Sequence, residues 1–183
     1  RPPGRAPARV PRHLRRNGPF CLPGWTVEPR KTHTFWLDSW EELGPDAPPL
    51  LICGSRGGNN AAVFDRLDQL PPGGAVQELP GLSDGAMMAL VQGAAGMVFP
   101  SHAEGYGLPP IEALQLGTRV LCNDLAILDE VLGNKAVYAT VSDPYLWIRK
   151  IEKWAKNPPD AHKMTDFVAP TWANHFKTVL RLT

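Results

Sequence analysis

The sequence predicts an α/β fold built on a doubly wound parallel sheet of the Rossmann-like type. Short apolar runs alternate with helical patterns about six times along the chain, without an internal repeat. One run, LLIC at 50–53, is apolar throughout, as expected for a strand covered on both faces. Loops that contain glycine follow several of these runs. Ligands of such folds bind at the carboxyl ends of the strands, so we expect these loops to meet at one edge.

Charge and length predict one domain preceded by a basic segment. Residues 1–17 hold six arginines and no acid, although the 183-residue chain has a net charge of only +1. We interpret residues 1–18 as a Pro/Arg-rich linker or leader, with binding to nucleic acid or to an anionic surface as the alternative. Residues 19–183 are long enough for one domain with a full core. Since the first residue is Arg and not Met, we expect the chain to be part of a longer protein.

Cysteine use and hydropathy favour a reducing compartment. The three cysteines lie far apart, and Cys53 and Cys122 end apolar runs in which a buried thiol is expected. The sequence has no metal-binding spacing, no apolar run of about 18 residues and no secretion signal in its basic leader. We therefore expect a cytoplasmic protein, with a peripheral position at the cytoplasmic membrane face as the alternative for the full-length protein.

The first half of the chain predicts strands and helices in alternation. The first strand, at 19–24, is expected to be short or bulged at Pro23, which cannot donate a ladder hydrogen bond. A turn with two adjacent cations, Arg30 and Lys31, follows it. The next elements are expected to be a helix at 34–43, a strand at 50–53 and a helix at 60–70.

The loop GSRGG at 54–58 raises two questions of ligand binding. Its glycines lack the spacing of a dinucleotide fingerprint, so we exclude NAD. Arg56 is either a ligand of a nucleotide or a structural residue, and the structural role is the more common one for a lone loop arginine.

The second half continues the same alternation. A helix after LPGLSD is expected to be capped by Ser83 or Asp84 and to place Met87 and Met88 in the core. The other elements are expected to be strands at 76–79, 97–99, 119–122 and 136–139, a helical turn at 129–132, a helix that starts at 143–144 and ends at 157, and an amphipathic helix at 171–182.

The central stretch is SHAEGYGLPPIEALQLG at 101–117. It predicts a strand, a glycine loop and a helix opened by two prolines, which are tolerated in a first turn. Backbone amides and the helix dipole at such a start favour a phosphate. Glu104 and Glu112 bracket the loop, and because carboxylates repel phosphate they should face hydroxyl groups. The residues therefore predict a site for a nucleotide attached to a sugar.

These residues resemble the retaining glycosyltransferases of the GT-B fold, in particular the family 4 group. That group carries two glutamates separated by seven residues around a Gly-Phe/Tyr-Gly-Leu-Pro core, and this sequence reads EGYGLPPIE at 104–112. The resemblance implies that Glu104 lies near the donor sugar and that Glu112 holds the ribose hydroxyls. It also implies that the backbone of Gly105, Tyr106, Gly107 and Leu108 meets the diphosphate or the sugar. An ordinary strand-to-helix turn with surface glutamates is the alternative.

Two further segments carry the resemblance. Many members have Glu-Pro-Arg-Lys where this chain has EPRK at 28–31, which implies that Lys31, with Arg30, contacts the donor diphosphate. Members usually have Asn or Gly after the lysine, and this chain has Thr32. The turn at 80–84 resembles the Gly-x-x-Ser-Asp turn of the family, which implies that Gly81 and Leu82 border the nucleotide base.

The resemblance covers residues 19–183 and implies the C-terminal, donor-binding half of a two-domain enzyme. That enzyme would transfer a sugar from a UDP-, GDP- or ADP-linked donor to an acceptor glycan or lipid-linked glycan in polysaccharide or glycoconjugate synthesis, with retention of configuration. The catalytic residues would be Glu104, Lys31 and Arg30, neither glutamate acting as a nucleophile, and neither a metal nor another cofactor is expected. Nucleic acid is not expected as a partner. A non-catalytic interaction module and an epimerase or phosphorylase on the same fold are the alternatives.

Overall fold

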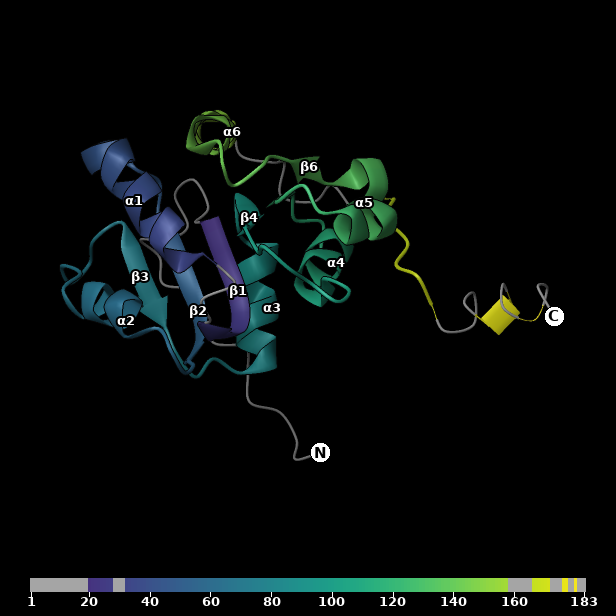
Figure 1. Cartoon of the computed structure of the whole chain (residues 1–183), viewed down its shortest axis with the longest axis horizontal. Coiled ribbons are helices and arrows are strands. Elements are labelled where there is room, and N and C mark those ends of the chain that lie inside the picture. The colour runs from purple at the N-terminus through teal and green to yellow at the C-terminus, as the bar shows by residue number, and fades with distance from the viewer. Residues whose placement is uncertain (1–19, 28–31, 158–165, 172–175, 178–179, 181–183) are drawn as a thin grey trace.

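The computed structural model describes residues 20–27, 32–157, 166–171, 176–177 and 180. A six-stranded sheet forms its centre, with strand order β3-β2-β1-β4-β5-β6 (Figure 1). All five strand pairs are parallel. This order and direction are those of the doubly wound fold that the sequence predicts. The strands are β1 (Phe20–Val27), β2 (Leu50–Arg56), β3 (Val76–Leu79), β4 (Gly96–Phe99), β5 (Val120–Cys122) and β6 (Val137–Tyr138).

The helices connect the strands in sequence order. They are α1 (His33–Leu43), α2 (Ala61–Asp68), α3 (Asp84–Gln92), α4 (Leu108–Gln115), α5 (Ala126–Leu132) and α6 (Pro144–Lys156), with short 3₁₀ turns at Gly44–Asp46 and Gly133–Lys135. The predicted cap at Ser83 is confirmed, since Ser83 Oγ accepts from the Ala86 amide. The helix start predicted at 143–144 is confirmed as well, and Asp143 Oδ1 accepts there from the Leu146 amide. Pro144 follows Asp143 at the start of α6, where its missing N–H has no partner to lose.

Helices cover both faces of the sheet. On one face Trp36 of α1 and Trp147 of α6 are fully buried with their ring centroids 5.1 Å apart. The side chains of α2 belong to the same cluster. On the other face α4 and α5 pack against Met97 and Phe99 of β4, and α3 packs against β2. Successive side chains of a strand therefore pack into the cores on opposite faces of the sheet, which explains the continuous apolar runs in the sequence.

Several element boundaries differ from the sequence prediction. β1 extends to Val27, and the expected irregularity is present as a register shift between Pro23 and Thr26 in the pairing with β2. β2 extends to Arg56, three residues beyond the apolar run. The basic leader, most of the helix expected at 171–182 and the cations Arg30 and Lys31 lie outside the described residues.

The expectation that Met88 belongs to the core is wrong. Its side chain is 54% exposed, whereas Met87 is half-buried and packs against both cores on its side of the sheet. The apolar sequence of α3 did not distinguish a core face from the wall of an open cavity. None of the described helices is both long and apolar enough to cross a bilayer.

Candidate functional site

The candidate site lies at the carboxyl edge of the sheet, near the point where strand order reverses. β1 pairs with β2 on one side and with β4 on the other. The connections that leave β1 and β4 therefore diverge to opposite faces, and ligands of doubly wound folds bind in the crevice between them. The loop at 100–107, which contains Glu104, follows β4 and leads into α4.

Two side chains fix the start of this loop by bonding its backbone carbonyls. Thr32 Oγ1 donates to the Pro100 carbonyl oxygen at 2.7 Å, which ties the start of α1 to the end of β4. Asn123 Nδ2 donates to the Ser101 carbonyl oxygen at 3.0 Å. This hydrogen bond holds Thr32 at the start of the loop that contains Glu104. Thr32 directly follows Lys31, the predicted ligand of the diphosphate. Lys31 itself lies outside the described residues.

Asn123 joins three segments and was not recognised in the sequence. Its side chain is 6% exposed, and its Oδ1 accepts from the amides of Asp124 at 3.0 Å and Val141 at 3.2 Å. A buried amide with donor and acceptor both used holds the ends of β4 and β5 in one arrangement. Only its place directly after the strand VLC hinted at this role.

Gly107 begins α4 in a conformation that favours glycine. Its φ is +79°, and a Cβ atom there would lie 2.5 Å from Leu128 Cδ2 of α5. The backbone of the loop therefore runs directly over the α5 side chain. By contrast, a Cβ at Gly105 would meet no atom within 4 Å, so this stretch of backbone borders open space.

The start of α4 has fewer free backbone amide donors than the sequence predicted. Its second and third residues are Pro109 and Pro110, which have no N–H, and the Ile111 amide bonds the Gly107 carbonyl at 3.4 Å. The amides of Gly107 and Leu108 remain as the donors of the first turn. The helix dipole is unaffected, so the site still favours an anion but with fewer direct bonds.

Beside this loop lies a cavity of about 410 Å³. It brings together three residues predicted from the sequence: Gly81 and Leu82 of the β3–α3 loop, and Glu112 of α4. The full lining is Gly54, Ser55, Gly81, Leu82, Asp84, Met87, Met88, Val91, Met97, Pro109, Glu112, Ala113, Gln115 and Leu116. The other described predictions are not lining residues: Glu104, Gly105, Tyr106 and Gly107 belong to the loop that precedes α4, and Leu108 is the first residue of α4.

The cavity wall is largely apolar, with polar groups at a few places. Leu82, Met87 and Leu116 offer surfaces for a flat ring, and the carboxylates of Asp84 and Glu112 offer hydrogen-bond acceptors. No described cation lines it, and two carboxylates would repel phosphate. The cavity therefore suits an uncharged ring with hydroxyl groups, while an attached anion would have to lie outside, toward the glycine loop. Met88 and Gln115 are lining residues that the sequence did not identify.

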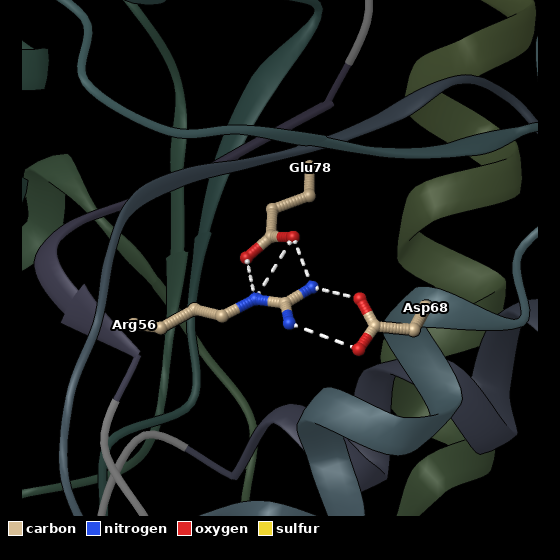
Figure 2. Close-up of polar contacts among 3 residues, drawn as sticks. All are labelled: Arg56, Asp68 and Glu78. Carbon is tan, nitrogen blue, oxygen red and sulfur yellow. Dashed lines mark hydrogen bonds and ion pairs between the residues drawn. The ribbon is translucent and has the colours of Figure 1, made fainter.

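Arg56 has a structural role, as the more common reading of a lone loop arginine predicts. Its guanidinium donates to Asp68 of α2 at 2.6 Å and to Glu78 of β3 at 2.7 Å (Figure 2). It also lies over the Phe64 ring, 5.2 Å from the centroid. Because it bonds both carboxylates, the guanidinium joins β2 to α2 and β3. Arg56 is not among the residues that line the cavity.

Other reactive groups give no sign of nucleophilic or metal chemistry in the described part of the chain. Burial raises the pKa of both Cys53 and Cys122 to about 12, so both thiols are neutral at pH 7. No cluster of three or more His, Cys, Asp or Glu side chains that could hold a metal ion occurs among the described residues.

The sequence matches the family model described as "Glycosyl transferases group 1" over residues 26–168. It is 29% identical over 167 residues to the serotype-specific mannosyltransferase WbdA of Escherichia coli, covering 88% of this chain and 20% of the relative. It is 30% identical over 121 residues to the E. coli O-antigen chain mannosyltransferase B, with coverage of 64% and 32%. It is also 28% identical over 139 residues to the O-antigen chain mannosyltransferase RfbU of Salmonella typhimurium, with coverage of 76% and 37%.

The fold is likewise similar to that of solved structures. The crystal structure of TarM superposes with a TM-score of 0.68 over 94% of this chain at 14% identity, and the match covers 36% of the TarM chain. The chain thus spans only a fifth to little more than a third of the length of the three sequence relatives, and a similar share of the TarM chain.

Proposed function

Because the chain belongs to the glycosyl transferases group 1 family, with a GT-B type donor fold, we propose that it is the donor-binding half of a retaining glycosyltransferase. The observation that carries the proposal is the cavity that joins the Gly81–Leu82 loop to Glu112 beside the EGYGLPPIE loop. It offers apolar surface and hydroxyl acceptors next to an anion-favouring helix start, which are the features that a nucleoside diphosphate sugar requires.

In this proposal each part of the donor meets a different segment. The base lies against Leu82 and Met87, and the ribose hydroxyls donate to Glu112. The diphosphate lies along Gly105 to Leu108, where no Cβ of residue 105 blocks its approach. Glu104 lies near the donor sugar.

Bond cleavage would depend on stabilising the leaving diphosphate. The bond between the anomeric carbon and the diphosphate oxygen breaks, the oxygen keeps the electron pair, and the sugar becomes oxocarbenium-like. Cations and amides that are already in place lower the barrier because they need no reorganisation as charge develops. Lys31, Arg30 and the amides of Gly107 and Leu108 are assigned this role, without a divalent metal. An acceptor hydroxyl then attacks the same face of the sugar and gives its proton to the departing diphosphate oxygen, so the sugar retains its configuration.

The acceptor and the cellular setting extend the proposal to the full-length protein. The acceptor-binding half is assigned to a domain outside these 183 residues. The relatives named above are mannosyltransferases, two of them named for the O-antigen chain, so mannose is the first sugar to test and a glycan or lipid-linked glycan the first acceptor. A cytoplasmic location with peripheral membrane association fits such an acceptor.

Calorimetric titration of the whole 183-residue chain with UDP, GDP and ADP tests the proposal. We expect one nucleotide to bind and Glu112→Ala to weaken its binding by about tenfold to a hundredfold, since a hydrogen bond to a charged acceptor is lost. Glu42→Ala, an exposed carboxylate of α1 that does not line the cavity, is the matched control and should bind normally. Absence of binding by all three nucleotides would favour an interaction module instead.

A further inference from the structure

The outer face of α6 carries a row of cations. Arg149, Lys150, Lys153 and Lys156 line one shallow groove of this face, with Glu152 as its single acid. Arg149, Lys153 and Lys156 are exposed and Lys150 is half-buried. Arg149, Lys153 and Lys156 follow one another at spacings of four and three residues, and Lys150 lies three residues before Lys153, so the four side chains lie on neighbouring rows of one side of the helix. We call these four residues the α6 basic face.

The charges of this face are not neutralised by described neighbours, unlike other cations of the domain. Arg56, Arg66 and Lys135 each form an ion pair with a carboxylate, at 2.6 to 2.7 Å. None of the four cations of the α6 basic face forms an ion pair within the part of the chain that the structure describes. Their field therefore extends into solvent, where it can attract an anionic partner.

Two apolar side chains continue the face at the start of α6. Tyr145 is 63% exposed and Leu146 is 48% exposed. The Arg149 guanidinium lies 5.7 Å from the centroid of the Tyr145 ring, so the ring and the cations form one surface. An exposed tyrosine and leucine beside a basic cluster match the boundary between lipid headgroups and acyl chains, because each can insert shallowly while the cations stay at the phosphates.

The orientation of this face is fixed by the opposite side of the helix. Trp147 and Ile151 are fully buried and Trp154 is 7% exposed, so α6 cannot roll to bury its cations. In Figure 1 α6 is seen nearly along its axis at the outer edge of the molecule, above the sheet. The basic residues thus belong to a rigid outer surface.

We propose that the α6 basic face, with Tyr145 and Leu146, docks the domain on an anionic lipid surface. The inference rests on the peripheral membrane association proposed above and names the surface that would provide it, but it does not depend on the nucleotide site. The joint presence of cations and exposed apolar groups favours a lipid surface over a nucleic acid, for which cations alone would suffice.

Sedimentation of the 183-residue chain with vesicles tests this assignment. One set of vesicles is pure phosphatidylcholine, and the other also contains about 30% phosphatidylglycerol to give an anionic surface. We expect binding only to the anionic vesicles, with about a hundredfold loss for Lys150→Gln/Lys153→Gln/Lys156→Gln, since each cation near such a surface contributes about fivefold. Tyr145→Ala/Leu146→Ala should weaken binding further without changing its salt dependence.

The basic leader provides the matched control, because it also carries arginines. Arg12→Gln/Arg15→Gln/Arg16→Gln removes the same charge from residues 1–17. If this variant loses binding and the α6 triple variant keeps it, the assignment is overturned. Binding of a DNA oligomer as tight as that of the anionic vesicles would overturn it as well. Nucleotide titration of the α6 variant should be unchanged, which separates failure of this inference from failure of the donor site.

Discussion

At the scale of single residues, the two glycines of the EGYGLPPIE loop should respond differently to alanine. Gly107 has a φ of +79° and no room for a Cβ, which would meet Leu128 Cδ2 at 2.5 Å. Gly107→Ala forces an L-residue into a left-handed backbone conformation and overpacks a buried contact. The free energy of unfolding should therefore fall by about 2 to 4 kcal/mol. Urea denaturation followed by tryptophan fluorescence measures this loss.

Gly105→Ala is the matched control for that substitution. Its Cβ would point into open space, so the free energy of unfolding should change by less than about 0.5 kcal/mol. If the diphosphate passes along this backbone, however, the new methyl group should weaken nucleotide binding about tenfold. A variant that is stable and binds normally would remove Gly105 from the proposed donor site.

The role of Thr32 could not be predicted from the sequence. Its φ and ψ are both 48°, a left-handed conformation that is unusual for a β-branched side chain. Asn or Gly would adopt that conformation more easily. The hydrogen bond from Thr32 Oγ1 to Pro100 offsets part of the strain, and because the partner is 68 residues away no local pattern indicates it.

At the scale of elements, the Arg56 network should make stability depend on pH. The Arg56 guanidinium, through its hydrogen bonds and its charge, holds the pKa of Asp68 below its ordinary value. A carboxyl with a lowered folded-state pKa stabilises the fold above its unfolded pKa and loses that contribution as pH falls through the folded pKa. The stability difference between the native chain and Arg56→Met should therefore be largest near neutral pH and shrink below about pH 4.

Urea midpoints measured from pH 2.5 to 7 check this expectation, a range chosen to span the ordinary Asp pKa of about 3.9. Arg66→Met provides a comparison, since Arg66 also pairs with two acids, the exposed Asp38 and Glu41. These pairs join α2 to α1, whereas Arg56 joins β2 to α2 and β3. A stability difference for Arg56→Met that stays constant over the whole range would show that the network contributes by packing alone.

The elements themselves could be predicted from the sequence to a large extent, because their signals are local. Apolar period, helix caps and proline placement located α3, α4 and α6 within a few residues. The site could be predicted only in part. Glu112, Gly81 and Leu82 do meet at one cavity, whereas Asn123 and Met88 were missed because their roles depend on contacts between segments distant in sequence. The sequence also predicted the two prolines in the first turn of α4, and their missing N–H groups remove two of the amide donors expected there.

At the scale of the whole molecule, the described cavity is bordered by both halves of the sheet. Gly54 and Gly81 come from the β2 and β3 side, and Glu112 comes from the α4 side. A ligand there joins the two βαβ halves, so binding should stabilise the domain as a unit. At a concentration a hundred times the dissociation constant, the gain is about 2.7 kcal/mol.

Sugar transfer by this chain alone should be very slow even when its donor is bound. In the proposed function, one wall of the reaction cleft and all contacts to the acceptor come from a domain outside these 183 residues. Without them the acceptor hydroxyl is not held at the anomeric carbon, and the loss of that orientation should reduce the rate by at least about a thousandfold. A transfer assay with a labelled nucleotide sugar, run on protein whose nucleotide binding has been measured in the same preparation, tests this. Turnover of about 1 s⁻¹ or faster, typical of complete enzymes, would refute the division of labour between two domains. Binding with no turnover would support it, because the donor site would then be formed while the geometry that attack requires is missing.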